Sequence, residues 1–298
     1  MAHSRITDQA GVDARHFAVE QAHQQLRHLG LQINRAIKSS SAVAVHDVRV
    51  AIRRFTQTIA VGRAYFHDLP KHRRLKKMMT AAGEVRNCDV ALKLIAKSRV
   101  PHSIQLRAKM QNRRKESARL LALELRKWTE RKIALQWRAA LNSTGTDDDA
   151  VHQLAQRTLG RIAKDFLKQG NEASTAGASP KVLHRFRIAA KKFRYALELF
   201  QPLYEPALDP IVQSIKRASA VLGDVNDCET VAAMVAEYKG GNRLADRLKK
   251  RQHKKIEEFR ACWKEEFHDE QGLRGRIDRL GRKPAASSRT AHSRKSAA

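Results

Sequence analysis

Residues Val45 to Phe55 read VHDVRVAIRRF and residues Leu183 to Phe193 read LHRFRIAAKKF, so the chain carries one pattern twice. Each copy contains a histidine, an arginine three residues later, basic residues seven and eight positions after the histidine, and a closing phenylalanine. In a helix that turns by about 100° per residue, the basic residues of each copy lie on one side and apolar residues lie on the other. We therefore expect two equivalent helices, each with a buried apolar face and a cationic face.

The cationic faces are expected to bind an anion. Like charges at these spacings repel one another and weaken an isolated helix by a few tenths of a kcal/mol per pair. An anionic ligand is the simplest reason to tolerate this repulsion, and the presence of two copies favours a ligand over a merely solvated basic surface. Each histidine has a second interpretation, as a helix cap or a core residue. The basic positions are His46, Arg49, Arg53 and Arg54 in the first copy, and His184, Arg187, Lys191 and Lys192 in the second.

The repetition extends beyond these two helices. The segment GEVRNCDV at Gly83 has a counterpart, GDVNDCET, at Gly223, and each lies at nearly the same distance from the preceding histidine. The chain is therefore interpreted as an internal duplication. The basic residues before the glycines also correspond, with Lys76 and Lys77 in the first half and Lys216 and Arg217 in the second.

The composition is typical of an all-helical protein, because strand-like alternation is hard to find and long segments are rich in Ala, Leu, Arg, Lys, Glu and Gln. We predict an all-α fold of two tandem helical bundles, residues 1–145 and 146–280, related by a pseudo-twofold axis. A basic cavity is expected between or along them. Gly83 and Gly223 are expected to end helices, as glycine often does. Residues 281–298 lack apolar periodicity and are predicted to form a disordered basic tail.

The charge of the chain indicates a polyanionic partner. Its 298 residues carry 59 Lys and Arg against 30 Asp and Glu, a formal net charge of +29. Nucleic acid, inorganic polyphosphate and an anionic lipid surface are the classes that fit this charge. No apolar run is long enough for a membrane span, and the N-terminal residues lack the apolar core of a secretory signal. Three cysteines without a CxxC pair favour the reducing cytoplasm.

The residue types favour binding over catalysis. Arginine forms bidentate bonds to phosphate and lysine supplies a compact charge. Since a helical turn rises about 5.4 Å, a basic residue at each turn can contact a linear polyanion repeatedly. The sequence has no Walker-type loop, no HExxH and no Cys/His cluster at zinc spacing. We expect no enzyme activity, no cofactor and no metal site. The carboxylates of the short acidic turns are interpreted as helix caps or ion-pair partners. The alternative is that they coordinate a divalent ion that bridges phosphates.

As a set, the two helix motifs and the two glycine segments closely resemble the CHAD family, the conserved histidine α-helical domain, from about residue 8 to residue 280. The resemblance implies an all-α fold of two similar bundles, a basic cavity or channel, and binding of inorganic polyphosphate. It also implies an association with polyphosphate or polyhydroxyalkanoate granules in the cytoplasm.

The resemblance also assigns roles to individual residues. It places the eight basic positions of the repeated helices in the anion site, and it extends that site onto the following helices. Arg86 keeps the arginine of the family's motif after the glycine, whereas Asn87 replaces the acid. The further residues assigned to polyphosphate binding are Lys76, Lys77, Arg86, Arg194, Tyr195, Lys216 and Arg217.

Two other functions compete with this hypothesis. A non-specific nucleic-acid-binding architectural protein would explain the charge and the basic tail equally well, and weak contact with nucleic acid is expected in any case. The aromatic content of 5% and the lack of a base-reading motif count against it. A metal-dependent polyphosphate hydrolase is the third hypothesis.

Overall fold

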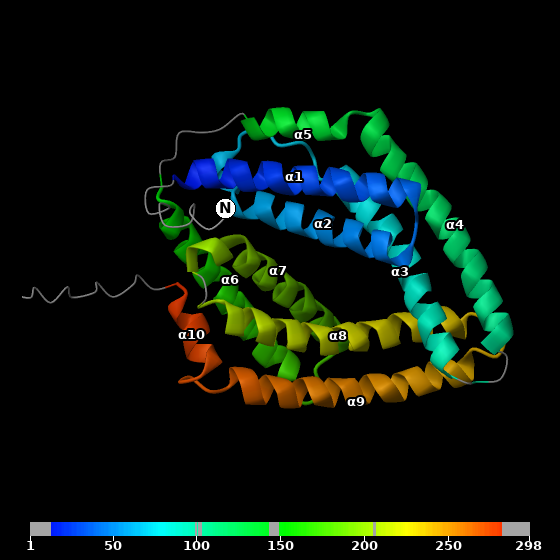
Figure 1. Ribbon diagram of the computed structural model, residues 1–298. Helices are drawn as coiled ribbons and strands as arrows, with labels where there is room; N and C mark the ends of the chain where they lie inside the picture. Colours follow the sequence, from blue (N-terminus) through cyan, green and yellow to red (C-terminus); the bar gives the residue numbers. More distant parts are fainter. Residues whose placement is uncertain (1–12, 99, 101–102, 143–148, 205–206, 282–298) are drawn as a thin grey trace, which may run out of the picture.

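Ten α-helices and one short 3-10 helix form the described part of the chain (Figure 1). The computed structural model describes residues 13–98, 100, 103–142, 149–204 and 207–281. The prediction of an all-α fold is confirmed, since an isolated bridge between Asp13 and Ala150 is the one β-type pairing among these residues. The elements are α1 (Ala14–Lys38), α2 (Ala42–Val61), η2 (Arg63–Tyr65), α3 (Arg73–Ser98), α4 (Ser103–Glu130), α5 (Ile133–Asn142), α6 (Val151–Ser174), α7 (Pro180–Tyr204), α8 (Asp209–Ala236), α9 (Asn242–Phe267) and α10 (Leu273–Arg279).

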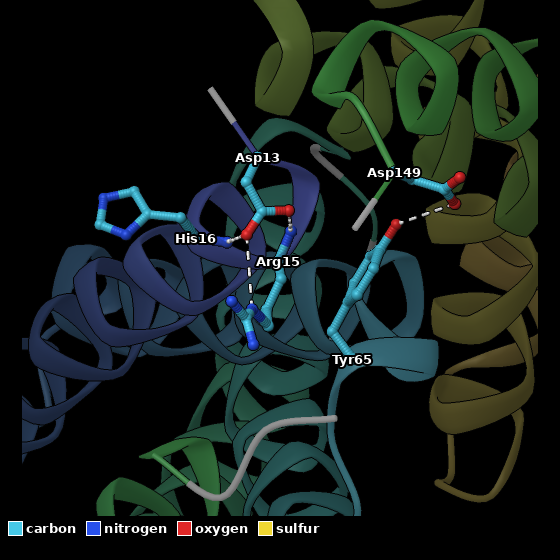
Figure 2. A network of polar contacts seen from close by, with 5 residues as sticks. All are labelled: Asp13, Arg15, His16, Tyr65 and Asp149. Carbon is cyan, nitrogen blue, oxygen red and sulfur yellow. Dashed lines mark hydrogen bonds and ion pairs between the residues drawn. The ribbon is translucent and has the colours of Figure 1, made fainter. Parts of the chain in front are cut away.

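The start of α1 is bonded to the start of α6, and Figure 2 shows the side chains of Asp13, Tyr65 and Asp149 in this region. Asp13 caps α1, because its carboxylate accepts hydrogen bonds from the backbone N–H groups of Arg15 and His16 at 3.0 and 3.4 Å. The backbone N–H of Ala14 donates to the carbonyl of Asp149 at 2.8 Å. The Tyr65 hydroxyl donates to the Asp149 carboxylate at 3.5 Å. These bonds join the beginnings of the first and second halves of the chain.

The two repeated helices are α2 and α7, and both bury the face that the sequence predicts to be apolar. Val48 and Phe55 of α2 and Phe186 and Phe193 of α7 are all fully buried. Ser41 caps α2, because its hydroxyl accepts a hydrogen bond from the backbone N–H of Ala44 at 3.2 Å. The cationic faces of both helices are therefore anchored from behind by one hydrophobic core that includes residues of both halves.

A second, smaller core lies where α3 and α4 meet α8 and α9 at one end of the molecule (Figure 1). Cys88 of α3 and Cys228 of α8 belong to it and are fully buried. Both cysteines therefore serve as small core residues.

The two glycines expected to end helices lie inside them instead. Gly83 is within α3 and Gly223 is within α8, so each of these helices continues through its glycine segment. For Gly83 the physical reason is a close approach, since a Cβ there would lie 2.9 Å from Nη1 of Arg49. Gly83 therefore leaves space for the guanidinium group of Arg49 and does not form a turn.

The predicted bundle boundaries at residues 145 and 146 remain predictions from the sequence. The predicted basic tail, residues 281–298, lies outside the described residues apart from Gly281. Among the helices that are described, none has an apolar stretch long enough to cross a bilayer.

Replacing Gly170 with alanine is expected to lower the free energy of unfolding by about 1–3 kcal/mol. The added Cβ would lie 2.0 Å from the Trp263 indole, which is itself packed against Phe166 and Phe267. Urea unfolding followed by circular dichroism measures the change. Gly30→Ala in α1 is the matched control, because no described atom outside its own helical turn lies within 4 Å of its added Cβ. We expect the control to raise stability by about 0.4–1 kcal/mol, and equal effects of the two substitutions would contradict the prediction.

Candidate polyanion-binding site

Helices α2, α3 and α7 border a cleft of about 510 Å³. Six arginine and lysine side chains line it, and no carboxylate does so among the described residues. The cations come from three helices and from both halves of the chain. They are Arg49, Arg53, Lys76, Arg187, Lys191 and Lys192.

The cleft brings the two repeated cationic faces together. Arg49 and Arg53 lie one turn apart on α2, and Arg187 and Lys191 lie one turn apart on α7. Arg49 is held in place because its Nη1 donates a hydrogen bond of 3.0 Å to the backbone carbonyl of Met79 in α3. The backbone of α3 therefore positions an arginine of α2 in the cleft.

Lys191 is the cation most affected by this crowding. Burial, together with the positive charges of Arg187, Arg53 and Arg49, lowers its pKa from 10.5 to about 6. Burial and the neighbouring cations Arg53 and Arg187 also lower the pKa of Arg49 to about 10. In the free protein, therefore, the positive charges of the cleft are only partly neutralised.

Asp227 of α8 supplies a partial counter-charge behind the cleft. Burial raises the pKa of its carboxyl group, and the nearby charges of Arg187 and Arg86 oppose that rise. Burial likewise lowers the pKa of Arg187, against the pull of Asp227. The Nε of Arg187 is buried and has no hydrogen-bond partner among the described residues. A single carboxylate therefore faces a larger group of cations.

The two predicted histidines lie in different surroundings. His184 lines the cleft. His46 does not line it, and partial burial together with the charge of Arg86 lowers its pKa. Arg86 lies near enough to affect His46, Arg49 and Asp227 electrostatically, so it adds to the positive charge around the cleft although it does not line it.

Other predicted residues lie outside the cleft. Arg54 forms an ion pair with Glu198 at 3.0 Å, and Arg194 approaches the same carboxylate at 3.4 Å. The guanidinium of Arg194 also lies 4.7 Å from the ring centroid of Tyr195. Arg54, Tyr195 and Lys216 line a neighbouring pocket of about 380 Å³, and Tyr195 also lines the cleft.

The second residue of each basic pair on α3 and α8 points to an acidic partner. Lys77 lies close enough to Glu124 to lower the pKa of that carboxyl group, after the larger effect of Lys127. Arg217 forms an ion pair with Glu266 at 2.7 Å and donates to the Ser214 hydroxyl at 2.8 Å. The structure therefore does not bring Arg217 to the cleft.

Seven lining residues of the cleft were not predicted as binding residues: Ile52, Thr56 and Gln57 of α2, His72 in the turn before α3, Leu75 and Met79 of α3, and Ile188 of α7. His72, Lys76 and Met79 follow one another at intervals of four and three residues, the spacing of one helical face. This spacing was the sequence signal that could have placed His72 and Met79 beside Lys76. Ile188 directly follows Arg187 and carries no charge, so a search for basic residues passes over it.

The model of the CHAD domain family matches residues 20–236. The chain belongs to the CHAD family. No curated protein sequence matches this family member.

Two solved structures share the fold. The CHAD domain from the plant Ricinus communis superimposes with a TM-score of 0.69 at 19% identity, covering 90% of this chain and 93% of the plant chain. PptA from Streptomyces chartreusis superimposes with a TM-score of 0.63 at 14% identity, covering 87% of this chain and 100% of PptA. At these identities the similarity shows the fold alone.

Among the described residues, no group of three or more His, Cys, Asp or Glu side chains is arranged to hold a metal ion. Instead, the acidic residues of the glycine segments contact cations. Asp89 forms an ion pair with Arg114 at 2.6 Å, and Asp224 lies 3.7 Å from both Arg251 and Lys255.

Lys191→Met is expected to raise the free energy of unfolding most strongly below about pH 6. Because the folded pKa is depressed to about 6 from 10.5, the unfolded chain binds a proton that the folded protein lacks between these values. The contribution of Lys191 to the wild-type free energy of unfolding therefore rises with pH between these values. The advantage of the methionine variant shrinks toward pH 10. Urea unfolding at several pH values measures the difference. Lys250→Met, at an exposed position of α9, is the control, and an advantage of Lys191→Met that does not vary with pH would contradict the prediction.

Proposed function

We propose that this CHAD protein binds inorganic polyphosphate in the α2–α3–α7 cleft without catalysing a reaction on it. The observation that carries the proposal is the set of six cations around one cleft, with no carboxylate in its described lining. The lowered pKa of Lys191 adds weight, since a bound polyanion would restore the charge that the free protein suppresses.

The spacing of the cations suits a chain of phosphates. Successive members on α2 and on α7 are one helical turn apart, a rise of about 5.4 Å. A linear polyanion lying between the two helices would contact arginine on one side and arginine and lysine on the other. Guanidinium groups can bind phosphate oxygens in pairs, so the contacts are directional as well as electrostatic.

The internal duplication belongs to this proposal. In our interpretation residues 1–145 and 146–280 are two bundles related by a pseudo-twofold axis, and each contributes one cationic helix to the site. The order of helix packing supports it, because α2 is followed by the α3–α4 pair and α7 by the α8–α9 pair. The two sides are unequal, since the positions of Lys191 and Lys192 are arginines in the first half.

Further parts of the proposal follow from family membership and from the charge of the chain. The protein would act in the cytoplasm, at polyphosphate or polyhydroxyalkanoate granules. Arg54, Arg194 and Lys216 would join the site only where a ligand extends from the cleft toward the neighbouring pocket, because two of them are paired with Glu198.

Replacing Arg49, Arg53, Arg187 and Lys191 together with alanine is expected to weaken binding of long-chain polyphosphate by at least about a hundredfold. Each charge-assisted hydrogen bond contributes about 1.5–3 kcal/mol, so four of them exceed this loss. Fluorescence anisotropy with labelled polyphosphate measures the affinity, and circular dichroism checks that helicity is retained.

A variant that loses the same number of arginine and lysine side chains is the control for that experiment. It replaces four exposed cations of α9 with alanine, and we expect less than about a tenfold loss, as general electrostatics predicts. Equal losses in the two variants would show that the protein responds to total charge, and the cleft assignment would be wrong. The residues replaced in the control are Arg243, Lys249, Lys250 and Lys254.

Competition separates polyphosphate binding from nucleic-acid binding. Duplex DNA and single-stranded RNA should displace labelled polyphosphate only at a large excess of phosphate groups, with salt held at about 0.15 M. Displacement at equal phosphate concentration would favour the nucleic-acid function instead.

Polyphosphate binding is expected to take up protons and to weaken as pH rises from about 7 to about 9. In the free protein the Lys191 amine is mostly neutral above its pKa of about 6, whereas the polyanion favours the charged form. Titration calorimetry in two buffers with different ionisation enthalpies, at about pH 7.5, measures the proton uptake. Lys191→Met should bind with a smaller uptake, and an unchanged uptake would assign the proton to another group.

A further inference from the structure

The cleft has an apolar wall as well as cations. Ile52, Leu75, Met79 and Ile188 line the same cavity as the arginines and lysines. Ile52 and Leu75 are almost fully buried and form part of the core, whereas the Ile188 side chain is 43% exposed. Helices α2, α3 and α7 thus present an aliphatic surface beside their positive charges.

Ile188 is the most informative member of this wall. It directly follows Arg187 on α7 and lies one helical turn from both His184 and Lys192, so basic side chains surround it. An inorganic phosphate chain is hydrated along its whole length and has no apolar surface to cover an isoleucine. Apolar surface is stabilised when another apolar group removes it from water. The wall is therefore suited to a ligand that has an apolar part.

We infer that the cleft binds phosphates that carry an aliphatic group, such as an alkyl or prenyl diphosphate. The phosphate end contacts the cations, and the hydrocarbon chain lies along Ile188 and Met79. This inference rests on the proposed function, because the same cations hold the phosphate end. The inference adds a ligand class that the charge of the cleft does not predict. Each CH₂ group that the apolar wall buries improves affinity by roughly fourfold.

The wall favours an aliphatic group over a nucleobase. A nucleobase would need aromatic faces for stacking and hydrogen-bond partners for its edge. The His72 ring, however, is already packed edge-on against Trp137, with ring centroids 5.4 Å apart. The Tyr195 ring is 5% exposed and lies beneath the guanidinium of Arg194 at 4.7 Å. Tyr195 is therefore covered, and the imidazole rings of His72 and His184 are exposed. The open apolar surface of the cleft belongs to the aliphatic side chains of Ile188 and Met79.

Titration calorimetry on the full chain tests this ligand class with two pairs of probes. Geranyl diphosphate is compared with inorganic pyrophosphate, and ATP is compared with inorganic tripolyphosphate. We expect geranyl diphosphate to bind at least about tenfold more tightly than pyrophosphate, which corresponds to two buried CH₂ groups. ATP should gain no advantage over tripolyphosphate.

Three substitutions locate the effect on the apolar wall. Ile188→Ser is expected to reduce the preference for geranyl diphosphate by at least about fourfold and to leave pyrophosphate affinity unchanged. Ile188→Leu should retain the preference. Ile104→Ser removes an isoleucine that is 80% exposed on α4 and does not line the cleft, so it should change neither affinity. Because Ile188 is partly exposed, its substitutions should not disturb folding.

The results distinguish this inference from the function on which it rests. Equal affinity for geranyl diphosphate and pyrophosphate, or an equal loss of both in Ile188→Ser, would overturn the inference alone if long-chain polyphosphate still binds. An advantage of ATP over tripolyphosphate without one for geranyl diphosphate would also overturn it. Failure of pyrophosphate, tripolyphosphate and long-chain polyphosphate to bind would overturn the proposed function itself.

Discussion

Repulsion among the cations of α2 and α7 is the constraint on which the rest of the structure depends. Arg49, Arg53, Arg187 and Lys191 face one cleft, and burial together with their mutual repulsion lowers the pKa of Lys191 to about 6. An arrangement of this kind opposes folding. The remaining contacts must therefore hold the two helices together against it.

The hydrophobic core provides that support. Each cationic helix has phenylalanines on its opposite face, and Phe55, Phe186 and Phe193 are fully buried. Full burial of a side chain of this size stabilises the fold by about 1.5–3 kcal/mol, so a few such residues can offset several unfavourable charge pairs. The start of α1 is also bonded to the start of α6, because the backbone N–H of Ala14 donates to the carbonyl of Asp149, and this bond links the two halves at a second place.

Charge is neutralised around the cleft more fully than inside it. Arg54 and Arg194 share Glu198, and Arg217 is paired with Glu266. Asp227 does not line the cleft but acts on Arg187 from behind it, and burial raises the pKa of that carboxyl group. The contrast separates cations that stabilise the fold from cations that are available to a ligand. It also explains why a high net charge alone does not identify the site.

The sequence by itself determined the all-α class, the two amphipathic helices and the cationic positions on them. These features follow from helical periodicity, which is local, so Val48 and Phe186 could be assigned to the core without a structure. Only the tertiary structure decided which cations meet. Whether Arg49 faces Arg187, or Arg217 instead turns to Glu266, depends on how helices far apart in the sequence cross. Gly83 shows the same limit, because its role inside α3 is to admit the Arg49 side chain of another helix, and no local pattern encodes that contact.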